Sequence, residues 1–165
     1  MTFRRTTARS VSRSPSAADK ALAAFGFGEM QPSYAQYYAG TVVLNYAAVQ
    51  DGVILYADLV KVYVDRQSAE VIGMDATNYR FRHRPRHVQT PSLSEQDARD
   101  RVSDALSIEA VSLALIPKCS TREVLCYECK CTRGETYFLV YINAQTGAEE
   151  EIFEVVNSEE GDLVV

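Results

Sequence analysis

Residues 62–69 read Val-Tyr-Val-Asp-Arg-Gln-Ser-Ala, and residues 140–147 read Val-Tyr-Ile-Asn-Ala-Gln-Thr-Gly. Both stretches begin with β-branched and aromatic residues, which favour strands, and both end in turn-forming residues. An earlier pair also matches, because Val43-Leu44-Asn45-Tyr46 corresponds to Val124-Leu125-Cys126-Tyr127. Matches that recur in the same order indicate that the chain contains one structural unit twice.

A helix is expected at the start of each copy. Ser94-Glu95-Gln96-Asp97 resembles a capping box, in which the serine hydroxyl binds a free backbone amide of the first helical turn. An apolar stripe then recurs every four residues, at Ala98, Val102 and Leu106. The counterpart in the first copy runs from Ser16, which lies 78 positions before Ser94, to Phe25.

The rest of each copy reads as strands separated by turns. The first copy also has about four extra residues, Leu55 to Asp58, that the second copy lacks. Short connections favour antiparallel pairing. The expected fold class is therefore α+β, with two tandem units that each pack a helix on an antiparallel β-sheet meander. The expected strands are residues 33–39, 41–50, 59–65, 71–75, 110–116, 123–132, 135–142 and 150–156.

This repeat predicts a division into four parts. Residues 1–15, rich in serine, threonine and arginine, are expected to be a disordered tail. The two units occupy residues 16–79 and 94–165. Between them, residues 80–93 carry two prolines and alternating arginines, which is typical of an exposed linker.

Charge argues against two classes of partner. The net charge of the 165 residues is −5. Residues 1–20 carry five basic and one acidic group, so the remainder carries 12 basic against 21 acidic groups. A body this acidic repels nucleic acid and phospholipid head groups. Since the sequence also has no apolar run of about 18 residues, we expect neither nucleic-acid binding nor membrane contact from this chain.

Four cysteines raise the question of a metal site. Cys119, Cys126, Cys129 and Cys131 could supply four thiolates to zinc. However, Cys129 and Cys131 face one side of a strand and Cys126 the other, and no turn separates them as in a zinc knuckle. We therefore expect the cysteines to be buried thiols with a structural role, and we expect no metal or other cofactor.

The sequence contains no recognisable catalytic constellation. His83 and His87 both lie in the arginine-rich linker, where nothing holds an imidazole against a nucleophile. There is no Gly-x-Ser-x-Gly, no phosphate-binding glycine loop and no His-Glu-x-x-His motif. The chain is therefore not expected to be an enzyme.

Two groups of residues are candidates for contact with a partner protein. Tyrosine is amphipathic and stiff, which suits a binding surface, although most tyrosines in strands need no such role. Alternating arginines along an extended segment would bind an anion or an acidic partner, or would simply be solvated. The candidates are Tyr34, Tyr37, Tyr38, Arg80, Arg82, Arg84 and Arg86.

Several motifs, in order, resemble the C-terminal PepSY-repeat region of the YpeB family of spore germination proteins. The resemblance covers roughly residues 40–165. Its motifs are Val49-Gln50-Asp51-Gly52-Val53, Tyr56-Ala57-Asp58, the segments 70–76 and 113–117, Glu123-Val124-Leu125-Cys126-Tyr127-Glu128 and the segment 141–150.

The resemblance implies a function without catalysis. Proteins of this family act with SleB-type cortex-lytic enzymes, which they stabilise and restrain through their PepSY domains. It also implies location in the spore, in the cortex or at the outer face of the inner spore membrane. Members normally begin with a membrane-anchoring helix, which is missing here, so the chain is expected to be the far end of a longer protein. A generic PepSY module that inhibits a secreted protease or hydrolase is the alternative.

Overall fold

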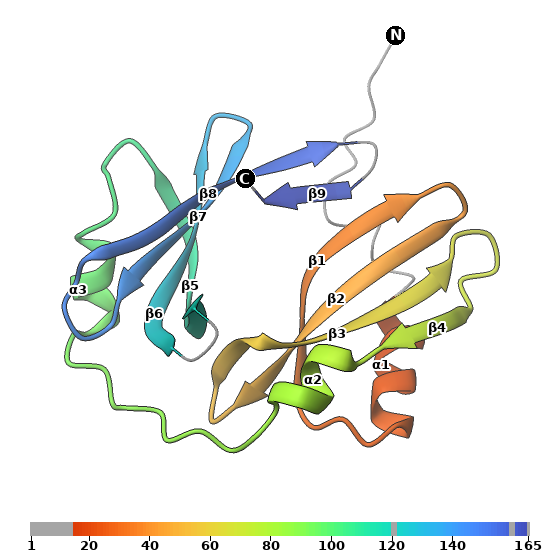
Figure 1. Ribbon diagram of the computed structural model, residues 1–165. Helices are drawn as coiled ribbons and strands as arrows, with labels where there is room; N and C mark the ends of the chain where they lie inside the picture. Colours follow the sequence, from red (N-terminus) through yellow and green to blue (C-terminus); the bar gives the residue numbers. More distant parts are fainter. Residues whose placement is uncertain (1–14, 120–121, 159–160, 165) are drawn as a thin grey trace, which may run out of the picture.

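The computed structural model of the protein describes residues 15–119, 122–158 and 161–164 (Figure 1). Apart from Pro15, the tail expected at residues 1–15 lies outside the described residues. The described part contains three short helices and nine strands. These are α1 Pro15–Ala24, β1 Met30–Tyr38, β2 Thr41–Gln50, β3 Val53–Asp65, β4 Val71–Asp75, α2 Thr77–Arg82, α3 Glu95–Arg99, β5 Ser107–Cys119, β6 Arg122–Arg133, β7 Thr136–Asn143, β8 Glu149–Ser158 and β9 Gly161–Val164.

The strands form one mixed, mostly antiparallel sheet, so the expected α+β class is confirmed. Its order is β2-β1-β9-β8-β7-β6-β5-β3-β4, and β2 also pairs with β3. Figure 1 shows two meanders, β1–β4 and β5–β8, that lie side by side. They join where the start of β3, at Val53–Leu55, pairs in parallel with β5. They meet again at β9, which pairs with β8 and touches β1 at one residue pair.

Helix α1 packs on one face of the first meander. Ala18 and Leu22 are buried in the same cluster as alternate residues of β2 and β3. Pro15 begins the helix, where its missing amide costs nothing, and Gly26 ends it in the left-handed conformation with φ 76°. The helix therefore lies within one residue of its expected position. Phe25, expected on the apolar face, is instead 74% exposed.

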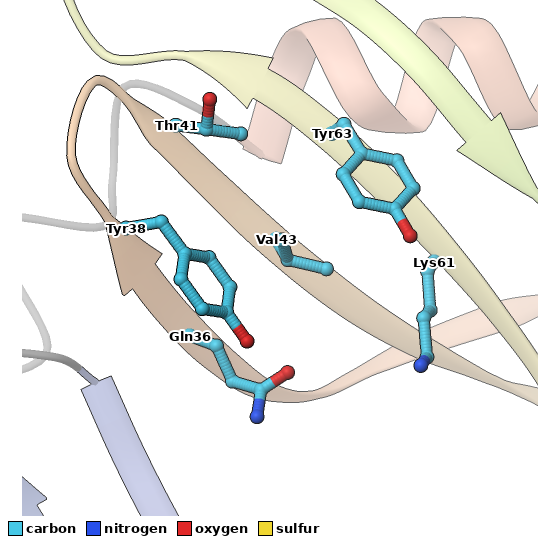
Figure 2. Close-up of a pocket in the computed structure, with 6 residues that line it drawn as sticks. All are labelled: Gln36, Tyr38, Thr41, Val43, Lys61 and Tyr63. Atoms are coloured by element: carbon cyan, nitrogen blue, oxygen red, sulfur yellow. The ribbon is translucent and has the colours of Figure 1, made fainter.

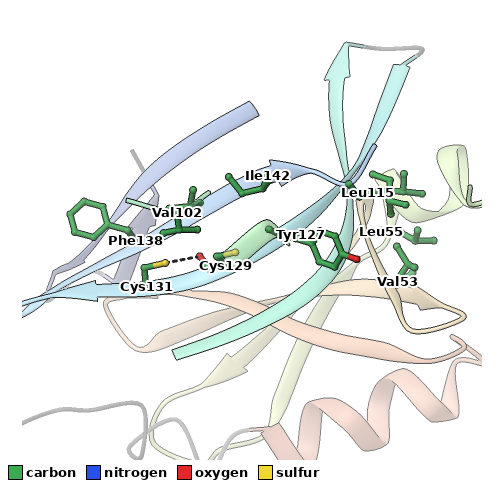
Figure 3. Packing of buried hydrophobic residues seen from close by; sticks show 14 residues of the cluster. Val53, Leu55, Val102, Leu115, Tyr127, Cys129, Cys131, Phe138 and Ile142 are labelled. Atoms are coloured by element: carbon green, nitrogen blue, oxygen red, sulfur yellow. Dashed lines mark hydrogen bonds between the residues drawn. The ribbon is translucent and has the colours of Figure 1, made fainter. Parts of the chain in front are cut away.

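The second core lies beneath α3 and extends into the first meander (Figure 3). Ala98 and Val102 pack against the strands of the second meander. Leu55, from the first, is fully buried in the same cluster because β3 and β5 pair side by side. The two meanders therefore share one hydrophobic core, and neither buries all its apolar surface without the other.

The turns after β3 and β7 have the same hydrogen bonds at positions 78 residues apart. Asp65 Oδ1 accepts from the amides of residues 67 and 68 at 2.9 and 2.7 Å. Asn143 Oδ1 accepts from those of residues 145 and 146 at 2.8 and 3.0 Å. The last turn residue is left-handed in both, with φ 60° at Ala69 and 76° at Gly147. The matched sequences thus encode matched turns.

The two turns predict that Ala69→Gly and Gly147→Ala change the free energy of unfolding in opposite directions. A side chain in the left-handed region costs about 1–2 kcal/mol, which glycine avoids at some entropic expense. We expect Ala69→Gly to raise the free energy of unfolding by about 0.5–1 kcal/mol and Gly147→Ala to lower it by about 1–2 kcal/mol. A Cβ at Gly147 would also collide with the guanidinium of Arg101 and displace that exposed side chain. Urea unfolding checks both variants, and changes of the same sign would contradict the argument.

The second helix is shorter than expected. The capping box at Ser94 is present, with Asp97 N donating to Ser94 Oγ at 3.1 Å and Asp97 Oδ2 accepting from Ser94 N at 2.8 Å. However, α3 ends at Arg99. The Asp100 amide still bonds four residues back to Gln96, but the amides of Arg101 and Val102 bond only three residues back. Ser103 accepts from the amide of residue 105, a local bond that competes with a helix. Val102 is still buried, as the apolar stripe predicts. The predicted helix, however, was too long, because α3 ends before Val102.

Residues 77–82 form a helix that the prediction of a linker missed. Asp75 Oδ1 accepts from Thr77 N at 2.9 Å at its start, and Arg80 and Arg82 occupy its last turn, which favours basic residues. The expected linker from residue 80 therefore begins inside α2. No helix in the described residues is long and apolar enough to cross a membrane.

A bulge in β3 accounts for the extra residues of the first copy. Ala47 pairs with Leu59, whereas the next residue, Ala48, pairs with Leu55. Residues 56–58 therefore have no register partner on β2. The equivalent pairing of β6 with β7 runs without a shift. The expected extra segment is confirmed to within a residue, and such bulges redirect side chains.

Candidate functional site

An open groove lies on the face of β1–β3 opposite α1 (Figure 2). Side chains alternate across a strand, so Val42 and Leu44 of β2 pack towards α1 while their odd-numbered neighbours face the groove. The groove encloses about 340 Å³. Its lining residues are Gln36 and Tyr38 from β1, Thr41 and Val43 from β2, and Lys61 and Tyr63 from β3.

The groove combines aromatic, amide and charged side chains. Tyr38 and Tyr63 present aromatic rings with a hydroxyl at the tip, Gln36 offers an amide, and Lys61 is the one charged lining residue. Amphipathic, stiff side chains of this kind are typical of protein-recognition surfaces. The six lining side chains include no carboxylate, imidazole or thiol.

The three candidate tyrosines do not share one surface. Tyr38 lines the groove and is 55% exposed. Tyr37 points to the other face, where it packs against the α1 cluster, and the Arg66 guanidinium lies 5.9 Å from the centre of its ring. Tyr34 is partly buried, and its carbonyl accepts from Asn45 Nδ2 at 3.3 Å. Of the three, only Tyr38 belongs to the groove.

The four candidate arginines do not line one edge of an extended segment, so that expectation is wrong. Arg80 and Arg82 lie in α2, and both are exposed, as is Arg84. The side chain of Arg86 turns inward and is only 10% exposed. Arg86 therefore has a structural role inside the protein, and three arginines remain on the surface.

Arg86 joins the two meanders through two carboxylates. Its Nη1 and Nη2 donate to Asp58 Oδ2 and Oδ1 at 2.6 and 2.7 Å, and its Nε and Nη2 donate to Glu123 Oε2 and Oε1 at 2.9 and 3.0 Å. Asp58 is fully buried on β3, and Glu123 lies on β6. Gln50 holds the backbone of Arg86 through both its amide and its carbonyl. We call Asp58, Arg86 and Glu123 the clasp.

The charge balance within the clasp keeps Arg86 ionised. Burial alone would lower the pKa of the guanidinium, but the hydrogen bonds and charges of Asp58 and Glu123 outweigh it, and the pKa is raised. A bidentate arginine–carboxylate pair is also geometrically specific. The segment expected to be a passive linker is thus fastened to both meanders.

His83 adds a second contact to Asp58. Its Nδ1 lies 2.8 Å from Asp58 Oδ2, and its ring stacks on Tyr79 with centroids 4.1 Å apart. Tyr79 in turn meets Phe27 edge to face at 4.9 Å. A small hollow of about 230 Å³ opens beside His83 and Tyr79. These contacts fix α2 and the following segment against the first meander.

Another buried carboxylate lies between the meanders. Glu128 is fully buried on β6 and its Oε2 accepts from Tyr56 Oη at 2.5 Å and from Tyr141 Oη at 2.8 Å. Lys130 Nζ is 4.0 Å from Oε1, beyond hydrogen-bonding distance. Burial raises the pKa of both tyrosines, and the charge of Glu128 raises it further. The phenols are therefore neutral donors at ordinary pH.

Sequence reasoning missed both buried carboxylates. Tyr56 and Asp58 belong to the β3 bulge, so the extra residues supply one partner for Glu128 and one for Arg86. The signal was present in the sequence: Asp58 is the one charged residue in the run Val53–Val60, at the place where the first copy was expected to be longer.

The cysteines follow the alternation expected of a strand. Cys129 and Cys131 are buried in the core beneath α3, with Cys131 Sγ donating to the Cys129 carbonyl at 3.5 Å, as Figure 3 shows. Cys126 is buried on the opposite face. Among the described residues no three histidine, cysteine or acidic side chains lie close enough to hold a metal ion.

This burial predicts which thiols react. Burial raises the pKa of Cys126 to about 12 and that of Cys129 to about 11, whereas Cys119 is exposed. A pKa raised by two units leaves about 100-fold less thiolate. We expect a disulfide reagent at mildly alkaline pH to label the folded protein at Cys119 and to spare the other three until denaturant is added. A Cys119→Ser variant should then be unreactive when folded. A second fast-reacting thiol would contradict the assignment.

Two family models match the chain. The model described as "YpeB sporulation, PepSY1 and PepSY2 domains" matches residues 1–89. The model described as "Peptidase propeptide and YPEB domain" matches residues 92–153. The boundary between them falls just after the clasp arginine.

Named relatives and a solved structure agree with these matches. The sporulation protein YpeB of Oceanobacillus iheyensis is 32% identical over 129 residues, which is 78% of this chain and 29% of that protein. YpeB of Bacillus subtilis is 32% identical over 117 residues, 71% of this chain and 26% of that protein. The chain thus spans less than a third of these relatives' length. The solved YpeB C-terminal domain of Bacillus megaterium superimposes with a TM-score of 0.82 at 27% identity, covering 89% of this chain and 66% of that one.

Proposed function

The chain belongs to the YpeB family of sporulation proteins, and we propose that it acts in spore germination as a non-enzymatic module that binds a SleB-type cortex-lytic enzyme. In this proposal it stabilises the enzyme in the dormant spore and restrains its activity there. The location that follows is the spore, in the cortex or at the outer face of the inner spore membrane.

Within this proposal the chain consists of two PepSY-like units, residues 16–79 and 94–165, joined by residues 80–93. The matched turns after β3 and β7 support the division, because the same hydrogen bonds recur 78 residues apart. The clasp then has a clear purpose, which is to hold the two units in one orientation for a partner.

One observation carries the proposal: the groove face of β1–β3 is open and amphipathic. Tyr38 and Tyr63 provide aromatic contact area, and Lys61 provides a charge that attracts a carboxylate. The buried Asp58 carboxylate is bonded inside the protein by Arg86, whereas the groove presents its side chains to a partner. Arg80, Arg82 and Arg84 are further candidates for contact with acidic groups of the enzyme.

The test is direct binding to the SleB-type enzyme from the same organism. The purified chain should bind it in calorimetry, slow its hydrolysis of cortex peptidoglycan and prolong its survival against an added protease. A Tyr63→Ala/Lys61→Ala variant should bind at least tenfold more weakly, while the Arg66→Ala control, which acts on the other face, should bind normally. The absence of all three effects for the unmodified chain would refute the proposal.

A second candidate function rests on the family description that matches residues 92–153, which includes peptidase propeptides. In that reading the chain restrains a secreted protease. Inhibition of a secreted metalloprotease, with no effect on the cortex-lytic enzyme, would favour this alternative.

A further inference from the structure

β4 has an open outer edge. It pairs with β3, through residues 61–64, and with no other strand of the described residues. Its sequence, Val71-Ile72-Gly73-Met74-Asp75, has no basic residue and no proline, and Ile72 is 60% exposed. The pairing of β4 with β3 passes from Gly73 to Val71, so Ile72 forms a β-bulge, which blunts part of the edge. Natural proteins also protect such an edge with charges, prolines or a covering segment, because its backbone groups can pair with another chain.

The second meander protects the corresponding edge. The position 78 residues after Val71 is Glu149, where β8 begins with three consecutive glutamates. Further along, β8 is paired by β9 through residues 155–158. Both strands have a bulge at corresponding positions, Ile72 in β4 and Glu150 in β8. Within the proposed two-unit division, the edge of β8 is charged and partly paired by β9, whereas the edge of β4 has an apolar centre and pairs with no further strand of the described residues. This difference makes the edge of β4, and not that of β8, the candidate for pairing with another chain.

We propose that β4 receives an extended segment of the partner enzyme, which adds to the sheet as a further strand. This inference deepens the proposed function and rests on it. Main-chain hydrogen bonds would supply the affinity, and side chains at alternate positions the specificity. A segment that pairs along the whole of β4 needs about five residues and cannot place proline at the positions whose amides face β4.

The charges around β4 define the chemistry of that segment. Glu70 precedes the strand and Asp75 ends it, so acidic side chains stand at both ends of an apolar centre. The hydrogen bonds of Asp75 with Thr77 lower its pKa, so this carboxyl is ionised at neutral pH. The complementary segment has an apolar residue beside Ile72 and basic residues at its ends.

The edge is continuous with the groove. Gly73 lies opposite Tyr63 in the pairing of β3 with β4, and a Cβ at Gly73 would lie 3.6 Å from the Tyr63 ring. Since Gly73 itself has no side chain, no side chain of β4 separates the added strand from the Tyr63 ring on that face. Lys61 lies opposite Asp75 in the same pairing, so Tyr63 is the groove residue that the added strand would meet. Groove and edge together form one binding surface.

The experiment compares exposed isoleucines on the two meanders. Ile72→Lys should weaken binding of the SleB-type enzyme at least tenfold, because a lysine blunts the edge and repels basic residues. Ile152→Lys, at a 48% exposed position of β8, should change binding less than twofold. Ile72→Thr, which keeps β-propensity, should bind within threefold of the wild type. Amide hydrogen exchange of residues 71–75 should slow in the complex, which a side-chain contact alone would not cause.

Each other result overturns the inference. If the wild type binds and Ile72→Lys binds equally well, the enzyme docks elsewhere while the proposed function stands. If Ile72→Lys and Ile152→Lys weaken binding equally, the loss comes from added positive charge on the surface and not from a contact at the edge of β4. If Ile72→Lys weakens binding without protection of residues 71–75, no strand is added. If the wild type fails to bind at all, the proposed function fails and the strand addition fails with it.

Discussion

Replacing Arg86 with methionine should lower the free energy of unfolding by about 3–5 kcal/mol, which is a large share of the stability of a domain this size. Methionine keeps much of the aliphatic volume but removes the guanidinium. The Asp58 carboxylate, which is fully buried, then keeps only His83 as a partner. Glu123 is 24% exposed and can turn to water, so the cost arises mainly at Asp58. In urea the midpoint should fall by about 2 M.

Two further variants isolate this effect. Arg84→Met changes an exposed arginine two residues away and should stay within about 0.5 kcal/mol of the wild type. Asp58→Leu/Arg86→Met removes both buried charges and should recover most of the loss, because an apolar pair avoids the desolvation cost. If Arg86→Met proves as mild as Arg84→Met, the clasp does not hold the meanders together. If the double variant is as unstable as the single one, the cost does not come from an unpaired Asp58.

The repetitive parts of the fold could be predicted because their signals are local. Runs of β-branched, aromatic and other apolar residues mark β2 and β6. The turn at Asp65 resembles the turn at Asn143, since both residues supply a side-chain oxygen to two backbone amides. Helix α3 was overestimated because the apolar stripe persists through Val102 after the backbone has left the helix. Burial follows the spacing of apolar residues, whereas helix length depends on competing local hydrogen bonds.

The contacts between the meanders could not be predicted, because they depend on residues far apart in sequence. The motif of alternating arginines looks uniform, yet Arg86 alone meets a buried carboxylate, 28 residues earlier at Asp58. The sequence did show where the first copy is longer. It did not show that the bulge turns Tyr56 and Asp58 towards the second meander, since that direction is set by the pairing of β3 with β5. Charged side chains whose partners lie on distant strands produce no periodic pattern in the sequence.

Removal of two hydroxyl groups should be nearly as damaging as loss of Arg86. In a Tyr56→Phe/Tyr141→Phe variant, Glu128 loses both hydrogen bonds to Oε2 while remaining buried. A hydrogen bond to a charged group contributes about 1.5–3 kcal/mol, so the pair should cost about 3–5 kcal/mol at neutral pH. The rings remain, including the edge-to-face contact of Tyr141 with Phe153 at 5.9 Å, so the loss measures the hydroxyl groups and not the packing. Urea unfolding at neutral pH gives the value, with Tyr137→Phe, at a 42% exposed position, as the control.

The pH dependence of the same comparison tests its cause. Burial and Glu128 raise the pKa of Tyr56 and Tyr141 in the folded protein above the ordinary value of about 10. In the unfolded chain these phenols ionise from about pH 10 upward, so the stability they contribute is complete below that pH and is lost as the pH rises beyond it. The double variant has neither phenol and escapes this loss. The difference in unfolding free energy between wild type and double variant should therefore be constant from pH 7 to pH 9 and shrink above about pH 10. A difference that stays constant above pH 10 would mean that the two hydroxyl groups are not held as neutral donors to a buried carboxylate, and Tyr56 would then have no electrostatic role in joining the meanders.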